Sequence, residues 1–219
     1  MTASFATSTV ADRLDALQAL AKTDPKAAQD AAWTWMEDLG QQLPGQAADD
    51  ELMQLFSLGT PADVDGQTYG MLIGFRAKPE GINRGGEIIY TIAKAFVSTF
   101  GVPWLGKKFD QAAMRGTNTM TRLAEVALPI LARYRTRKAA GNTCEGFDML
   151  NRFEDSVVAP GTRILVLDYE DASLGNPWPV NQIRDEAVQI VPGTYIGAKI
   201  WHQESGYKQI AWWASKLDV

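Results

Sequence analysis

The C-terminal part of this chain is a series of short apolar segments separated by tight turns, and this pattern restricts the fold more than any other feature. Such segments cover residues 147–153, 163–169, 180–191, 194–202 and 209–214. Pro-Gly pairs at 160–161 and 192–193 mark turns between them. Consecutive β segments joined by short turns predict an up-and-down meander, which is either an antiparallel barrel or a strongly curved sheet.

The N-terminal part has a different, helical pattern. Thr9 is suited to cap a first helix, and Asp24-Pro25 combines a good N-cap with a proline at the first helical position. The second helix is expected to end at Gly40, and a short third helix to begin at Asp49 or Asp50 and run through Phe56. The pattern of this region therefore predicts three helices and no strand.

The composition changes at Leu58-Gly59, after which glycine, aromatic and β-branched residues dominate. We therefore expect an N-terminal helical arm or cap over residues 1–57. Residues 58–219 are expected to form the antiparallel barrel, with one or two inserted helices, in a single compact domain. The predicted fold class is α+β. Alternating β–α–β units are absent, which argues against a parallel α/β sheet.

The residues between these two regions are predicted to contain a strand at 67–77, a helix at 87–100, a short strand at 104–110, a turn at 116–118 and a helix at 120–136. Gly70 and Gly74 within the first strand indicate a bend or the close approach of another segment. The helix over 87–100 is either part of the core or a lid over a ligand cavity.

The net charge, the small numbers of cysteine and histidine, and the hydropathy argue against several classes of function. The net charge of -5 argues against nucleic-acid binding. One cysteine, Cys144, and one histidine are too few for an ordinary zinc site. No metal or cofactor is predicted, although a carboxylate-rich Mg²⁺ or Ca²⁺ site and haem, with His202 as an axial iron ligand, stay open as alternatives. No apolar stretch is long enough to span a membrane, and no signal peptide is apparent. We expect a cytoplasmic protein, and a homodimer is left open.

Four residues are candidates for catalysis. Asp168 shares a strand face with apolar residues, so it is either paired or functional, and Arg184 is a candidate partner. His202 suits acid–base chemistry if it faces inward, although a position at the rim or surface fits its place before a turn. Tyr195 is either a hydrogen-bond donor in a cavity or a half-buried aromatic residue.

Large aromatic side chains are candidates for lining a ligand cavity. Trp212 and Trp213 are adjacent on one strand, so they point to opposite faces, and both faces of the sheet must be covered. Each candidate is also compatible with an ordinary core position. The ligand-binding candidates are Tyr69, Tyr90, Phe96, Trp104, Trp178, Trp201 and Trp212.

Several motifs together resemble bacterial, largely uncharacterised calycin-like proteins related to the GXWXG and lipocalin-like groups. The motifs are the glycine-punctuated strand after Leu58-Gly59, Trp104-Leu-Gly-Lys-Lys-Phe109, Gly116-Thr-Asn118, Asn176-Pro-Trp-Pro179, Arg184-Asp-Glu186 and Pro192-Gly-Thr-Tyr-Ile-Gly197. The likeness covers roughly residues 58–217. The GXWXG signature is altered: its closest match is Gly66-Gln-Thr-Tyr-Gly70, where Tyr69 replaces the tryptophan. The resemblance implies a small antiparallel barrel around a cavity for one apolar molecule.

Three functions are therefore open. The first is binding of a small hydrophobic molecule in the barrel. The second is a metal-independent isomerase, lyase or cyclase that acts on a hydrophobic, polyketide- or terpenoid-like substrate in the same cavity. The third is a protein-interaction module that uses the helical arm. No intact catalytic motif of a known class decides among them.

Overall fold

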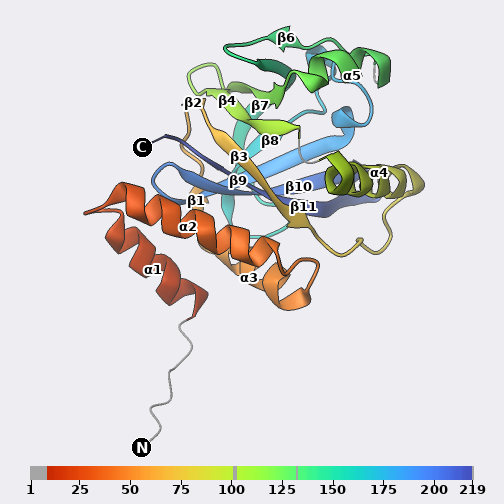
Figure 1. Ribbon diagram of the computed structural model, residues 1–219. Helices are drawn as coiled ribbons and strands as arrows, with labels where there is room; N and C mark the ends of the chain where they lie inside the picture. Colours follow the sequence, from red (N-terminus) through yellow and green to blue (C-terminus); the bar gives the residue numbers. More distant parts are fainter. Residues whose placement is uncertain (1–8, 101–102, 132, 219) are drawn as a thin grey trace, which may run out of the picture.

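Within residues 9–100, 103–131 and 133–218, which the computed structural model describes, the protein contains five α-helices and one antiparallel sheet (Figure 1). The helices are α1 (Val10–Leu20), α2 (Pro25–Gly40), α3 (Gln46–Leu58), α4 (Arg84–Phe100) and α5 (Leu123–Leu131). The strands are β1 (Thr60–Pro61), β2 (Gly66–Gln67), β3 (Tyr69–Phe75), β4 (Trp104–Asp110), β5 (Arg115–Thr121), β6 (Arg137–Lys138), β7 (Thr143–Asp155), β8 (Arg163–Asp168), β9 (Ile183–Val191), β10 (Thr194–Gln203) and β11 (Gly206–Lys216). Two 3-10 helices, η1 (Ala172–Leu174) and η2 (Val180–Gln182), lie between β8 and β9.

The strands form a nearly closed barrel. Their order in the sheet is β2-β4-β5-β7-β8-β9-β10-β11-β3, so most neighbours in space are also neighbours in sequence. Residues 66–75 join the two ends, because β2 pairs with β4 whereas β3 pairs with β11. Between β2 and β3, the backbone N–H of Thr68 donates to the carbonyl oxygen of Lys107 at 2.8 Å. The predicted fold class, α+β with N-terminal helices followed by an antiparallel barrel, is confirmed.

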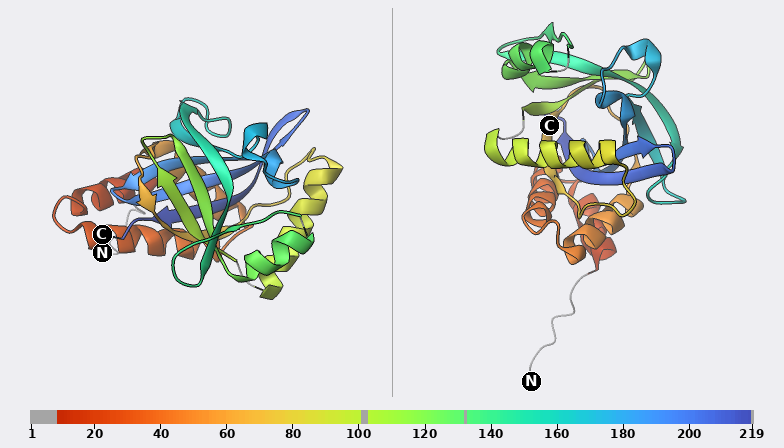
Figure 2. Two further views of the ribbon diagram at one scale, coloured as in Figure 1. Left: turned by 90° about the horizontal axis from the view of Figure 1, so that it is seen from above. Right: turned by 90° about the vertical axis from the view of Figure 1, so that its right-hand side faces the viewer.

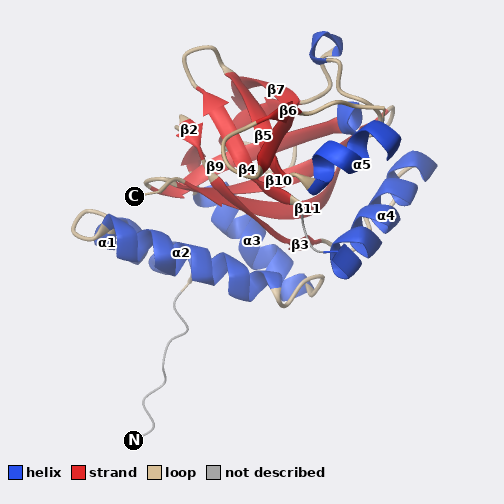
Figure 3. Cartoon of the chain, turned by 45° about the horizontal axis from the view of Figure 1, so that its top comes forward, coloured by secondary structure: helices blue, strands red, loops and turns tan. Residues whose placement is uncertain are grey.

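Successive side chains along each strand point alternately to the inside and the outside of the barrel. On β11, Trp212 points outward and packs against Phe56 of α3, with ring centroids 5.7 Å apart, whereas Trp213 points into the barrel. The expectation that both faces are covered is therefore correct. Helices α1, α2 and α3 cover one outer face, as Figure 3 shows, and their buried side chains form one core with the outward side chains of β8 to β11.

The N-terminal helices begin where the sequence predicts. Thr9 and Asp12 form a capping box at α1, and Asp24 accepts a hydrogen bond from the backbone of α2, which starts at Pro25. Helix α3 begins earlier than expected, at Gln46. Its buried Asp49 accepts hydrogen bonds from Arg76 and from the indole of Trp212, which attach α3 to the barrel.

Two predictions for the middle of the chain are wrong. Residues 116–118 belong to strand β5, and the reversal before it lies at 111–114. The helix expected over 120–136 is shorter, since Met120 and Thr121 also belong to β5 and α5 spans Leu123–Leu131. Gly116 is needed for close packing within the strand and does not mark a turn, because a Cβ on it would lie 2.3 Å from Met149.

Candidate functional site

The barrel encloses a cavity of about 320 Å³, which lies at the small end of the range for ligand pockets. Helix α4 lies across one end of the barrel, and it faces the viewer in the right-hand panel of Figure 2. Ile89 and Ala93 of α4 and Val180 of η2 contribute to the lining on this side. The cavity is lined by Leu72, Phe75, Ile89, Ala93, Pro103, Trp104, Lys107, Asn118, Met120, Phe147, Tyr169, Pro179, Val180, Ile183, Asp185, Lys199, Ile210, Ala211 and Trp213.

A buried lysine, Lys107, is the central polar group of this lining. Its side chain is only 2% exposed. The Nζ atom donates to Asp185 Oδ2 at 3.0 Å, to Asn118 Oδ1 at 3.2 Å, and lies 2.5 Å from Tyr169 Oη. A fully buried lysine needs such partners, because an unpaired buried ammonium is strongly unfavourable.

A bulge in β4 brings Lys107 into the barrel. The pairing of β4 with β5 shifts register between Trp104 and Gly106, so Trp104 and Lys107 both line the cavity although they are three residues apart. Gly106 has φ of 151°, and a Cβ at this position would lie 2.0 Å from the carbonyl oxygen of Thr68. Only glycine permits this close approach between β4 and the segment joining β2 to β3.

A second lysine shares the same carboxylate. Lys199 Nζ lies 3.1 Å from Asp185 Oδ1 and 3.3 Å from Asp185 Oδ2. Asp185 is completely buried, whereas the side chain of Lys199 is 33% exposed. Asp185, Lys107 and Lys199 are the only charged residues among those that line the cavity in the described part of the chain.

Two neutral polar residues complete the cluster. Asn118 Nδ2 donates to the carbonyl oxygen of Phe147 at 2.9 Å and to Tyr169 Oη at 3.2 Å. This orientation leaves Asn118 Oδ1 as the acceptor for Lys107. We call Lys107, Asn118, Tyr169, Asp185 and Lys199 the inner cluster.

Burial changes the ionisation of the inner cluster. It lowers the pKa of Lys107 below its ordinary value, although the charge and hydrogen bond of Asp185 oppose this effect. Burial, reinforced by the negative charge of Asp185, raises the pKa of Tyr169 far above its ordinary value. Tyr169 therefore keeps its hydroxyl proton, while Lys107 holds its proton less firmly than an exposed lysine does.

Two tryptophans flank Lys107. Lys107 Nζ lies 4.8 Å from the ring of Trp213 and 5.3 Å from the ring of Trp104, and the two rings meet edge-on with centroids 6.0 Å apart. Both indole Nε1 atoms are buried, and neither has a hydrogen-bond partner among the described residues. The Nε1 edge of Trp213 lies against β10, where a Cβ on Gly197 would be 2.6 Å from it.

Three of the four catalytic candidates lie on the outer side of the wall. Asp168 pairs with Arg152, and not with Arg184 as the sequence suggested. Arg184 instead contacts Glu154 and Glu186 at 3.0 and 2.9 Å. None of these residues lines the cavity.

His202 is also on the outer side, and Tyr195 lies inside the barrel but away from the cavity. His202 Nδ1 lies 3.0 Å from Glu170 Oε1, and the imidazole stacks on Tyr207. Tyr195 donates to the carbonyl oxygen of Asp63 at 2.8 Å. The structure therefore does not gather the four candidates into one site, and their catalytic roles stay predictions.

The aromatic candidates are also spread over the molecule. Trp104 lines the cavity. Tyr90 and Trp201 belong to the inner core, where they bond to the carbonyl oxygen of Arg76 and to Asn83 Oδ1. Tyr69 and Trp178 are 56% and 53% exposed, and Trp212 is on the helix-covered face. The side chain of Phe96 lies outside the described residues.

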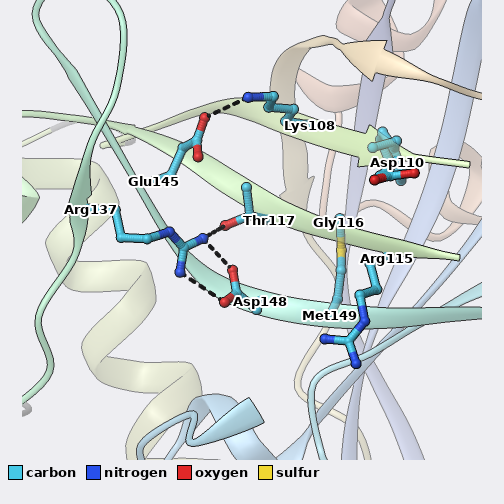
Figure 4. Close-up of a pocket in the computed structure, with 10 residues that line it drawn as sticks. Lys108, Asp110, Arg115, Gly116, Thr117, Arg137, Glu145, Asp148 and Met149 are labelled. Atoms are coloured by element: carbon cyan, nitrogen blue, oxygen red, sulfur yellow. Dashed lines mark hydrogen bonds and ion pairs between the residues drawn. The ribbon is translucent and has the colours of Figure 1, made fainter. Parts of the chain in front are cut away.

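A second pocket, of about 270 Å³, is formed by β4, β5, β6 and β7 (Figure 4). Four of its six charged side chains form two pairs. Arg137 binds both carboxylate oxygens of Asp148 at 2.9 and 2.6 Å, and Lys108 contacts Glu145 at 3.3 Å. All six charged side chains of this pocket are at least partly exposed, whereas the inner cavity holds the buried Lys107 and Asp185, so the inner cavity is the stronger candidate.

The described residues lack two further features, a metal site and a membrane-spanning helix. No group of three or more His, Cys, Asp or Glu side chains is arranged to hold a metal ion. None of the described helices combines the length and apolarity that crossing a bilayer requires.

Comparison with known proteins does not assign a family. No family model matches the sequence, and no curated protein matches it. A crystal structure of a protein from Thermomonospora curvata is similar to this chain at 16% identity, with a TM-score of 0.40 over 83% of this chain and 99% of that one. A likeness this distant supports no argument about function.

Proposed function

We propose that the protein binds a small, largely apolar molecule that carries a hydrogen-bond acceptor, inside the barrel cavity. The observation that carries the proposal is the unequal distribution of groups along the wall. Most lining side chains are apolar, while the polar ones gather in the inner cluster. Such a wall favours an apolar body and fixes the orientation of one polar group.

The chain itself uses the acceptors of the inner cluster. Asp185 accepts from both lysines, and Asn118 Oδ1 accepts from Lys107. A donor remains on Lys199, because its ammonium group has three N–H donors and bonds only to Asp185 among the described residues. A ligand that supplies an acceptor to this group is therefore favoured over a purely apolar one.

The other expected functions have weaker support. The resemblance to calycin-like proteins implies the same kind of ligand, but it remains a hypothesis because no family model matches. The buried faces of α1, α2 and α3 pack on the barrel, so a protein partner of this region would meet their remaining polar faces. An isomerase, lyase or cyclase stays a prediction, and the buried lysine is the observation that favours an enzyme.

Calorimetric titration with 2-octanone, a small apolar ketone, tests the proposal. Ala93→Phe places a larger side chain on the cavity side of α4, and Thr91→Phe adds the same group at an exposed position of the same helix. We expect the wild type and Thr91→Phe to bind equally, and Ala93→Phe to bind at least about tenfold more weakly, because it fills the space that the ligand needs. Equal affinity in all three proteins, or no binding by any of them, would contradict the proposal.

A further inference from the structure

We propose that Lys107 is a reactive amine, which forms an imine with the carbonyl carbon of a small, largely apolar ketone or aldehyde in the cavity. This inference rests on the proposed function, because the carbonyl compound must first occupy the cavity. It is carried by the charge balance of the inner cluster, by the partners of the Lys107 amine, and by the donors of Tyr169 and Lys199.

The charge balance identifies Lys107 as the neutral lysine. Two lysines contact one carboxylate, so the cavity would hold one excess positive charge if both were protonated. The excess is relieved if one lysine gives up its proton. Water reaches Lys199, which is 33% exposed, but not Lys107, which is 2% exposed, so Lys107 is the less stable cation. Desolvation of this kind is a recognised way to activate a lysine as a nucleophile.

The partners of Lys107 accommodate the neutral form completely. A neutral amine has two N–H donors and one lone pair. Asp185 Oδ2 and Asn118 Oδ1 are pure acceptors, and they take the two donors. Tyr169 Oη, at 2.5 Å, accepts from Nζ when the amine is protonated, and its hydroxyl donates to the lone pair when the amine is neutral. When this hydroxyl turns to a ligand, the lone pair is released.

The groups around Lys107 fit a carbonyl oxygen. Tyr169 lies beside Lys107 and keeps its hydroxyl proton, and Lys199, which lines the same cavity, carries an ammonium group. These two donors stabilise negative charge that develops on the oxygen. The apolar remainder of the lining receives the hydrocarbon part of the ligand.

The reaction is balanced without an oxidant or a reductant. The lone pair of Lys107 forms the C–N bond, and the π electrons of the carbonyl move to its oxygen, which takes a proton from Tyr169. A proton of the new ammonium returns to Tyr169 and leaves a carbinolamine. The C–O bond then breaks, its oxygen takes a proton from Lys199, and water departs. The nitrogen lone pair forms the C=N bond, and the iminium proton returns to Lys199.

Reductive trapping tests the inference. The whole protein is incubated with 2-octanone and sodium cyanoborohydride, and the adduct is measured by intact mass and located by peptide mapping. The matched control is Lys108, the next residue, whose side chain is 54% exposed. We expect one adduct per chain on Lys107 in the wild type and in Lys108→Met, and at least a tenfold loss in Lys107→Met and Lys107→Arg.

The outcomes separate this inference from the proposed function. Mapping on the wild-type protein locates the adduct even if a Lys107 variant fails to fold. Adduct confined to Lys199 or to exposed lysines overturns the inference. Calorimetric binding of 2-octanone without any adduct overturns the reactive lysine but leaves the binding function, whereas neither binding nor adduct overturns both.

Discussion

The two faces of strand β9 carry buried ionic networks that differ in what surrounds them. Asp185 points inward to Lys107 and Lys199, next to the cavity. Glu186, the next residue, points outward and is equally buried, but it accepts from Arg184, from the hydroxyl of Ser156 at 2.5 Å and from a backbone N–H. The outer carboxylate is satisfied by the chain, whereas the inner one lies among more donors than the chain can use.

The cations also differ in kind. The outer network uses arginine, which stays protonated at any ordinary pH, whereas the inner cluster uses lysine, whose pKa falls readily on burial. A network of arginines is therefore fixed in charge. A network of two lysines around one carboxylate changes its charge at little cost, and this property suits chemistry more than stability.

The largest expected effect tests this difference at the carboxylates. Glu186→Gln leaves the buried Arg184 without its closest partner, and we expect the free energy of unfolding to fall by about 3–5 kcal/mol. Asp185→Asn should cost less, about 1–3 kcal/mol, because Lys107 is the neutral lysine and Lys199 is partly solvated. Urea denaturation at pH 7 measures both values.

Asp155→Asn is the control for a lost carboxylate charge, because the side chain of Asp155 is 77% exposed. Its effect should stay within about 0.5 kcal/mol. If Asp185→Asn costs as much as Glu186→Gln, then Lys107 does not release its proton, and the distinction between the two faces of β9 is wrong.

The alternation of side chains along a strand predicts part of the difference between the two faces of β9. Alternation correctly separates Trp212 from Trp213 and places Asp168 with apolar residues of the outer face. It does not say which of the two faces is the interior, because both faces of this wall are buried. Asp168, Arg184 and His202 were candidates because they are ionisable residues on apolar strands, and the structure puts all three outside.

The inner cluster was missed for a physical reason. Lys107 and Lys108 are adjacent in sequence, so nothing in their charge distinguishes the buried lysine from the exposed one, and a strict period of two puts Trp104 and Lys107 on opposite faces. The bulge at β4 brings both inside. The available signal was Gly106, since a glycine in a strand often marks a bulge. The cavity forms because the barrel closes. The sequence predicts a barrel or a curved sheet, but it does not give the strand pairing that closes it.

The pH dependence of stability is a second test of the charge on Lys107. The pKa of Lys107 is lowered in the folded protein, so between that pKa and the ordinary value of 10.5 the unfolded chain binds a proton that the folded chain does not. Stability from this group therefore rises with pH in that window, by up to about 1.4 kcal/mol per pH unit. Lys107→Met removes this contribution.

We therefore expect the difference in unfolding free energy, Lys107→Met minus wild type, to decrease as pH rises toward 10.5. The titratable groups that face Lys107 are Tyr169, Asp185 and Lys199, and all three remain in the variant. Urea denaturation at several pH values from 6 to 10, roughly the span between the ordinary pKa values of histidine and lysine, measures the difference. A constant difference over this range would show that Lys107 keeps its proton.

The smallest expected effect compares a tyrosine from each side of the wall. Tyr169→Phe removes one partner of Lys107 and one of Asn118, and it should lower the free energy of unfolding by about 1 kcal/mol. Tyr207→Phe, on the outer face, should change it by less than about 0.5 kcal/mol, because Tyr207 is partly exposed and contacts His202 by stacking.

The rate of reductive trapping distinguishes a role of Tyr169 in the reaction from a role in stability alone. Tyr169→Phe should slow adduct formation by roughly 10²-fold if its hydroxyl delivers a proton to the carbonyl oxygen. Tyr207→Phe should react like the wild type. If both variants trap 2-octanone at the wild-type rate, Tyr169 has only a structural role, and the proton must come from Lys199.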